Sequence, residues 1–248
     1  MARSRRVPPP PVIREQPVVE RVPMPDDEVV LAPKRKRNRG GSTVDVTEVG
    51  FTGVAKDTES KVRRRLMEAA TAFERERFGD AQRMLQSIEK LAPGAPEVAE
   101  LLGLSYYRQG KWREAIRELE RFEALTGTVE QHPVLADCFR ARGDYARVAA
   151  LWIELGEGSP SAELVEEGRI VSAGALADQG KVKDAIRMLE TAPKAPKKLK
   201  IHHLRRWYAL ADLYERGGDL KRAKRLFTEI EAQSPGFGDV AQRIRMLR

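Results

Sequence analysis

The sequence has a single cysteine, three histidines and no long apolar run, and these absences exclude several classes of protein. Cys138 cannot form a disulfide within the chain, so we interpret it as a small buried hydrophobic residue in a reducing compartment. No stretch approaches the roughly 20 apolar residues that span a bilayer, and the N-terminus lacks the apolar core of a signal peptide. We therefore expect a cytoplasmic protein without a membrane span.

The few histidines show no pattern typical of a metal site or a catalytic centre. His202 and His203 are adjacent, so on a helix their side chains diverge by about 100° and cannot hold one ion from one face. His132 stands alone before Pro133, and the segment GEGSPS at 156–161 lacks the lysine of a phosphate-binding loop. No Ser/His/Asp or Cys/His arrangement can be identified. The sequence predicts a non-enzymatic protein with no catalytic residues, no metal and no cofactor.

Aromatic residues are scarce in the first sixty residues, where Phe51 is the only one, whereas more than half of the 15 prolines lie there. Such a segment cannot bury enough apolar surface to offset the entropy lost on ordering, so residues 1–58 are predicted to be a disordered tail. The tail contains a compact polycation, which can contact nucleic acid or another anionic surface weakly, or can simply serve as a solvated linker. Its residues are Lys34, Arg35, Lys36, Arg37 and Arg39.

The net charge of +8 is not gathered in one stripe. Residues 1–60 carry 11 Lys/Arg and 9 Asp/Glu, a net of +2, which leaves +6 for residues 61–248. In this larger part opposite signs alternate at spacings of three and four, as in REAIRELERFEAL, and this pattern is typical of solvated helix faces. A nucleic-acid-binding face would instead concentrate one sign. Binding of nucleic acid through the basic tail is therefore the alternative hypothesis.

One short pattern recurs along the chain. QGKWREAI at 109–116 is followed by RGDYARV, QGKVKDAI and GGDLKRAK, and preceded by ERFGDA, which lacks the leading glycine. Between glycine or proline breaks the apolar residues follow a helical period, so each copy marks the turn of a helical hairpin. The small or β-branched residue of the pattern recurs at spacings of 34, 33, 37 and 38, at Ala81, Ala115, Val148, Ala185 and Ala223. We expect residues 59–248 to form an array of five hairpins that ends in a short capping helix.

These residues resemble the tetratricopeptide repeat family, whose unit is a helical hairpin of about 34 residues. The second copy shows the likeness best, with Leu102, Gly103, Tyr106, Gly110, Trp112, Ala115 and Leu119, and the likeness extends over residues 62–235. The resemblance implies an all-α fold, a right-handed α-α superhelix that carries the tail at its N-terminus.

The resemblance also implies a protein-interaction scaffold or adaptor. In this family the first helices of the repeats line a concave groove, and we expect that groove to bind another protein through an extended or helical segment. The residues expected to face the groove are Glu74, Glu100, Leu104, Tyr107, Arg108, Asp137, Arg140, Tyr208 and Asp212.

Overall fold

The computed structural model describes residues 56–158, 161–193 and 199–247. The tail predicted from the sequence, with its polycation, lies outside the described residues except for its last three positions. Those positions begin the first helix, which starts at Lys56, within the range that the sequence assigned to the tail. The array therefore starts slightly earlier than residue 59.

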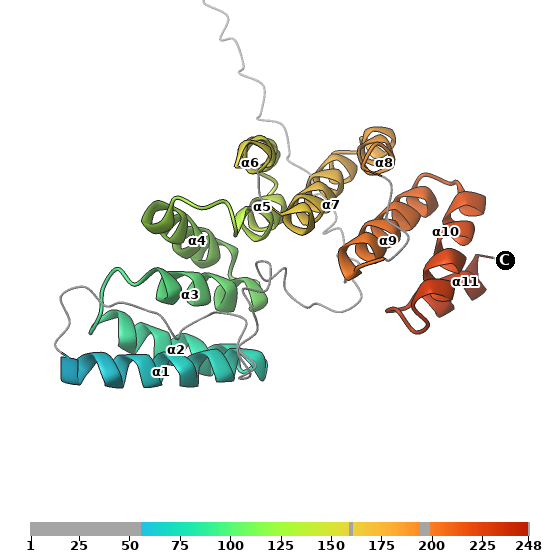
Figure 1. Ribbon diagram of the computed structural model, residues 1–248. Coiled ribbons are helices and arrows are strands. Elements are labelled where there is room, and N and C mark those ends of the chain that lie inside the picture. The colour runs from blue at the N-terminus through green and yellow to red at the C-terminus, as the bar shows by residue number, and fades with distance from the viewer. Residues whose placement is uncertain (1–55, 159–160, 194–198, 248) are drawn as a thin grey trace, which may run out of the picture.

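All regular structure in the described part of the chain is helical, as predicted (Figure 1). The helices are α1 (Lys56–Glu74), α2 (Phe78–Glu89), α3 (Pro96–Arg108), α4 (Trp112–Thr126), α5 (His132–Ala141), α6 (Tyr145–Glu157), α7 (Ala162–Asp178), α8 (Val182–Glu190), α9 (Ile201–Arg216), α10 (Leu220–Gln233) and α11 (Val240–Met246).

The helices pair into five hairpins, α1/α2 to α9/α10, and α11 packs on α10. The first helix of each hairpin also contacts the first helix of the next, whereas among the described residues no second helix contacts another second helix. The first helices therefore lie closer together, and the array curves with them on the inside (Figure 1). We call the side lined by α1, α3, α5, α7 and α9 the inner face.

The turn inside each hairpin requires a left-handed backbone residue. Gly110, Gly143, Gly180 and Gly218 occupy this position with φ between 70° and 82°. In the first hairpin, which lacks the glycine, Glu76 takes the same position with φ 58°, a conformation that costs a residue with a Cβ atom roughly 1 kcal/mol or more. The repeat thus preserves its turn geometry even where its sequence departs from the pattern.

We expect Glu76→Gly to stabilise the protein by about 0.5–1 kcal/mol, because glycine adopts this conformation without steric cost. The same substitution at Glu68, an exposed residue within α1, should destabilise by about 1 kcal/mol. Urea unfolding of both variants measures the difference. A loss of stability in Glu76→Gly as large as that in Glu68→Gly would contradict the turn assignment.

Small residues bring the two helices of a hairpin close together. Ala81, Ala115 and Ala223 have no accessible surface, and a Cβ added to Gly103 would lie 2.6 Å from Leu119 Cδ2. The larger apolar side chains then fill the space between hairpins. The small residues that define the repeat in the sequence are therefore required by helix packing.

The C-terminal helix covers the last hairpin. Val240 of α11 is fully buried, and Phe237 just before it lies in the same core cluster as Tyr208 and Phe227. The Tyr208 hydroxyl donates a hydrogen bond to Asp239 Oδ1 at 2.7 Å, which ties α9 to the start of α11. Burial and this hydrogen bond raise the pKa of Tyr208. Helix α11 thus packs over the C-terminal end of the last hairpin.

Candidate interaction surface on the inner face

Polar side chains near the C-terminal ends of the first helices join one repeat to the next. The Tyr107 hydroxyl donates to Asp137 Oδ2 at 2.9 Å, which links α3 to α5. Arg140 Nε donates to Asp178 Oδ2 at 2.6 Å, which links α5 to α7, and Arg140 Nη1 lies 3.6 Å from Asp137 Oδ1. Arg140 therefore bridges two acidic residues on its two sides.

The same row of contacts continues to both ends of the array. Arg216 Nη2 of α9 lies 3.9 Å from Asp178 Oδ1. Beyond it, Arg243 of α11 donates to Asp212 Oδ1 at 2.9 Å and to Glu215 Oε2 at 2.8 Å. Towards the N-terminus, Arg108 Nη2 lies 3.4 Å from Glu76 Oε1. We call this row the inter-repeat ladder, which consists of Glu76, Tyr107, Arg108, Asp137, Arg140, Asp178, Asp212, Glu215, Arg216 and Arg243.

A glycine makes room for the central member of the ladder. A Cβ atom added to Gly174 of α7 would lie 2.5 Å from Arg140 Nη1, so a larger residue at this position would force the guanidinium to shift. Burial lowers the pKa of Arg140, but the hydrogen bond to Asp178 and the charges of Asp137 and Asp178 raise it by more. The net shift of the pKa is therefore upward. Arg140 is thus a permanent cation held between two carboxylates.

Two residues expected to face the groove do not do so. The side chain of Leu104 has no accessible surface and belongs to the core of the first three hairpins, and Tyr208 is 1 % exposed against Phe227. Both side chains pack against other helices of the array, so a partner cannot contact them. Leu104 and Tyr208 are therefore removed from the candidate surface.

The other expected residues lie on the surface or at its edge. Glu74 is exposed, and Glu100 accepts a hydrogen bond from Gln131 Nε2 at 2.7 Å. The ladder contains the remaining five, which are Tyr107, Arg108, Asp137, Arg140 and Asp212. The sequence analysis did not predict that these side chains pair with one another, although opposite charges at matched positions in successive repeats would have indicated it.

A second group of charges is buried between α7 and α9. Arg206 is 4 % exposed and Glu166 is 6 % exposed, and Arg206 Nη1 donates to Glu166 Oε1 at 2.9 Å and to the Pro193 carbonyl oxygen at 3.0 Å. Next to them, Arg205 Nε lies 3.3 Å from Glu167 Oε1. This cluster fixes the joint between the fourth and fifth hairpins. The charge pattern of the sequence predicts solvated helix faces, and this prediction is wrong for Arg206, which is buried.

Burial is the main cause that raises the pKa of Glu167 to about 7; Arg205 opposes this shift, and the nearby carboxylates of Glu163 and Glu166 add to it. The folded state therefore binds a proton more tightly than the unfolded state, in which the reference pKa is 4.5. Between pH 4.5 and 7 the folded state holds more protons, so the stability contributed by this group falls as the pH rises.

We expect the free energy of unfolding to fall by about 2–3 kcal/mol more in the wild type than in Glu167→Gln as the pH rises from 5 to 8, since Gln cannot ionise. Urea titrations at pH 5, 6, 7 and 8 measure the two slopes. Parallel curves for the two proteins would show that Glu167 does not titrate in this range.

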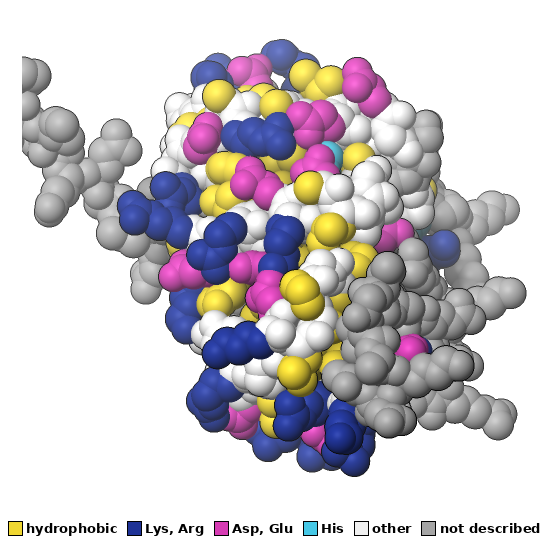
Figure 2. Space-filling model, turned by 90° about the vertical axis from the view of Figure 1, so that its left-hand side faces the viewer, with side chains coloured by type: hydrophobic (Ala, Val, Ile, Leu, Met, Phe, Trp, Pro, Cys, Tyr) yellow, Lys and Arg dark blue, Asp and Glu magenta, His cyan; other side chains and the backbone are white. Residues whose placement is uncertain are grey.

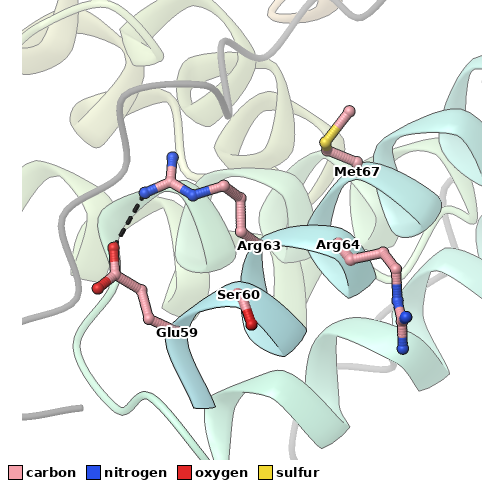
Figure 3. Close-up of a pocket in the computed structure, with 5 residues that line it drawn as sticks. All are labelled: Glu59, Ser60, Arg63, Arg64 and Met67. Atoms are coloured by element: carbon pink, nitrogen blue, oxygen red, sulfur yellow. Dashed lines mark hydrogen bonds and ion pairs between the residues drawn. The ribbon is translucent and has the colours of Figure 1, made fainter. Parts of the chain in front are cut away.

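A shallow hollow lies beside α1 (Figure 3). All its described lining residues come from this one helix, and Arg63 turns back toward Glu59, to which its Nη2 donates at 3.0 Å. Arg64 and Met67 point away from that pair. Because a single helix presents a convex surface and its neighbouring charges already pair, we assign no ligand to this hollow.

The face of the molecule in Figure 2 mixes both signs of charge. In Figure 2, acidic side chains lie between the Lys and Arg side chains over most of the visible face. This arrangement lacks the single-sign stripe that a nucleic-acid-binding face would have. Among the described helices, none is both long enough and apolar enough to cross a bilayer.

The family model for the tetratricopeptide repeat matches residues 66–127 and 102–158, which include the second and third hairpins. A thermophilic tetratricopeptide repeat protein from Thermus thermophilus has a similar structure, with a TM-score of 0.59 and 16 % identity, over 75 % of this chain and 98 % of that one. The chain therefore contains tetratricopeptide repeats.

Two further comparisons add little to this assignment. The tetratricopeptide array also aligns with a structure of Naa15/Naa10 bound to HypK, over 77 % of this chain and 34 % of that one, at 13 % identity. The TM-score of this alignment is 0.34. No curated protein sequence matches the tetratricopeptide chain.

Proposed function

We propose that this protein is a non-enzymatic scaffold that binds a segment of another protein on the inner face of its repeats. The fold itself is typical of protein-interaction scaffolds. The observation that supports a site on the inner face is the inter-repeat ladder, which lines the ends of the first helices with half-buried tyrosine, arginine and aspartate side chains. Because its members come from successive repeats, a segment laid along the array would contact several of them.

Tyr107 and Arg108 are the members best suited to dominate binding. Tyr107 stacks edge-to-face on Trp112 with ring centroids 5.7 Å apart, and the Arg108 guanidinium lies 4.7 Å above the Phe78 ring. Both side chains are therefore held in place before a partner arrives, which lowers the entropy lost on binding. Tyrosine and arginine are also the residue types that most often dominate protein interfaces.

We expect the double variant Tyr107→Ala with Arg108→Ala to weaken binding of a captured partner by about tenfold or more, equivalent to roughly 1.4 kcal/mol. The partner is first captured from a cell lysate with the full chain, then purified and titrated by calorimetry. The matched control is Arg113→Ala with Glu120→Ala, two exposed residues of α4 in the same repeat. Circular dichroism verifies that each variant keeps its helices.

The alternative function, nucleic-acid binding through the basic tail, predicts a different result. Deleting residues 1–55 should then abolish binding, and affinity should fall steeply between about 50 and 200 mM salt, as it does when many phosphate contacts are made. On the proposed function, the tail deletion matters less than the double variant. A double variant that binds normally, with captured material that nuclease removes, would replace the proposed function by the alternative.

A further inference from the structure

A histidine and two glutamates from three helices meet near the N-terminal end of α5, whereas the ladder residue Arg140 lies near the C-terminal end of that helix. His132 begins α5, Glu123 lies in the last part of α4, and Glu154 lies in α6. His132 Nε2 is 3.2 Å from Glu123 Oε1, and His132 Nδ1 is 4.0 Å from Glu154 Oε2. One ligand atom from each of the three residues lies within 4.8 Å of the others.

The imidazole at the centre of this cluster is buried and has no hydrogen bond. His132 is 2 % exposed, and within the described part of the chain neither ring nitrogen has a hydrogen-bond partner. A buried polar side chain in this state costs about 1–3 kcal/mol unless another interaction satisfies it. The two carboxylates are only about one-third exposed, so they also lack full hydration.

The donor set suits a borderline metal ion. Zn²⁺ binds imidazole nitrogen and carboxylate oxygen at about 2.0–2.2 Å in a tetrahedral arrangement, which places two ligand atoms roughly 3.4 Å apart. The distance of 3.2 Å between His132 Nε2 and Glu123 Oε1 is close to that value. Glu154 Oε2 lies nearest the other ring nitrogen, Nδ1, at 4.0 Å, so the partly exposed Glu154 side chain must move toward the Nε2 side to reach the same ion, with water as the fourth ligand.

The other oxygen of Glu154 is already held. Arg147 Nη1 donates to Glu154 Oε1 at 2.7 Å, within α6, so Oε2 remains directed at the histidine. Partners of this kind orient metal ligands in known sites. With His132 neutral, Glu123, Glu154 and Arg147 sum to one negative charge, which attracts a divalent cation.

We propose that Glu123, His132 and Glu154 form a binding site for a divalent transition-metal ion, with Zn²⁺ as the preferred ion. The ion joins α4 of the second hairpin to α5 and α6 of the third, and so acts as a structural cross-link between two repeats. The site uses residues separate from the inter-repeat ladder, and it does not depend on the proposed partner binding. No sequence motif indicates it, because the three ligands are nine and twenty-two residues apart and only the fold brings them together.

The test uses the full chain after treatment with a chelator. We expect calorimetry to show one equivalent of Zn²⁺ bound, and Co²⁺ to produce the visible absorption of a tetrahedral site. His132→Gln and Glu123→Gln should each weaken binding at least tenfold. The matched control, His202→Gln with His203→Gln, removes the other two histidines and should leave the affinity unchanged.

X-ray absorption on the wild-type zinc complex needs no variant and therefore covers the case in which His132→Gln does not fold. It should show one imidazole nitrogen, oxygen ligands and no sulfur. The proposal would be overturned if Zn²⁺ showed no saturable binding or if the spectrum showed a sulfur ligand. It would also be overturned if the His202/His203 control lost Zn²⁺ binding while His132→Gln kept it. If the three side chains form only an ion-paired histidinium, Zn²⁺ will leave the melting temperature of the wild type unchanged, which also overturns it.

Discussion

Replacing Arg206 with alanine is expected to destabilise the protein by about 3–5 kcal/mol, the largest effect of any charged residue in the described chain. The substitution leaves the carboxylate of Glu166 buried, 6 % exposed, without its closest guanidinium, and Arg169 Nε, 4.0 Å away, is a weaker partner. It also removes the donor to the Pro193 carbonyl oxygen. Urea unfolding monitored by circular dichroism measures the loss.

Two variants separate this mechanism from a general loss of charge. Arg225→Ala, an exposed arginine of α10, should change the stability by less than about 0.5 kcal/mol. The double variant Glu166→Leu with Arg206→Met removes both buried charges and should recover most of the stability. If the double variant is as unstable as Arg206→Ala, the cost arises from lost packing, and the ion pair is not its origin.

Phe227→Ala is expected to cost about 3–5 kcal/mol, because Phe227 is fully buried and its removal leaves a cavity. The ring contacts Tyr208 at a centroid distance of 5.6 Å and lies 5.0 Å from the Arg243 guanidinium, so the cavity opens where α9, α10 and α11 meet. In a repeat array each unit contacts only its neighbours, and damage stays local.

Hydrogen exchange measures whether the loss of stability stays local to these helices. Protection should fall in α9, α10 and α11 of Phe227→Ala while α1 to α4 keep the wild-type rates. Glu229→Ala, an exposed neighbour on the same helix, is the control and should leave all rates unchanged. Equal loss of protection along the whole chain would mean that the array unfolds as one cooperative unit.

The repeat period, the helical hairpins and the capping helix could be predicted from the sequence. Small residues at Ala81, Ala115 and Ala223 mark helix contacts that any hairpin of this kind needs, so the pattern is strong. The left-handed turn at Glu76 was not predictable from its residue type, since glutamate is unfavourable there. The position of Glu76 in the repeat, which is equivalent to that of the turn glycines, would have indicated the left-handed conformation.

The candidate surface was only partly predictable. A helical period gives the face on which Leu104 and Tyr208 lie, but how deeply a face is covered depends on the curvature of the array, and both residues are buried. The contacts of Arg140 with Asp178 and of Arg206 with Glu166 span 38 and 40 residues, and pattern reasoning within one helix cannot find them. Which of these residues form pairs depends on how far apart neighbouring repeats lie.

Site-specific photo-crosslinking tests most directly whether the inner face binds a protein segment. A photoreactive amino acid is placed at residue 100, a partly exposed position of the candidate surface on α3, or at residue 120, on the exposed side of α4 in the same repeat. Residue 100 should give a crosslinked partner band from a lysate, and residue 120 should give little or none. Crosslinking at residue 120 alone, or at neither residue while deletion of residues 1–55 abolishes binding, would contradict a binding site on the inner face.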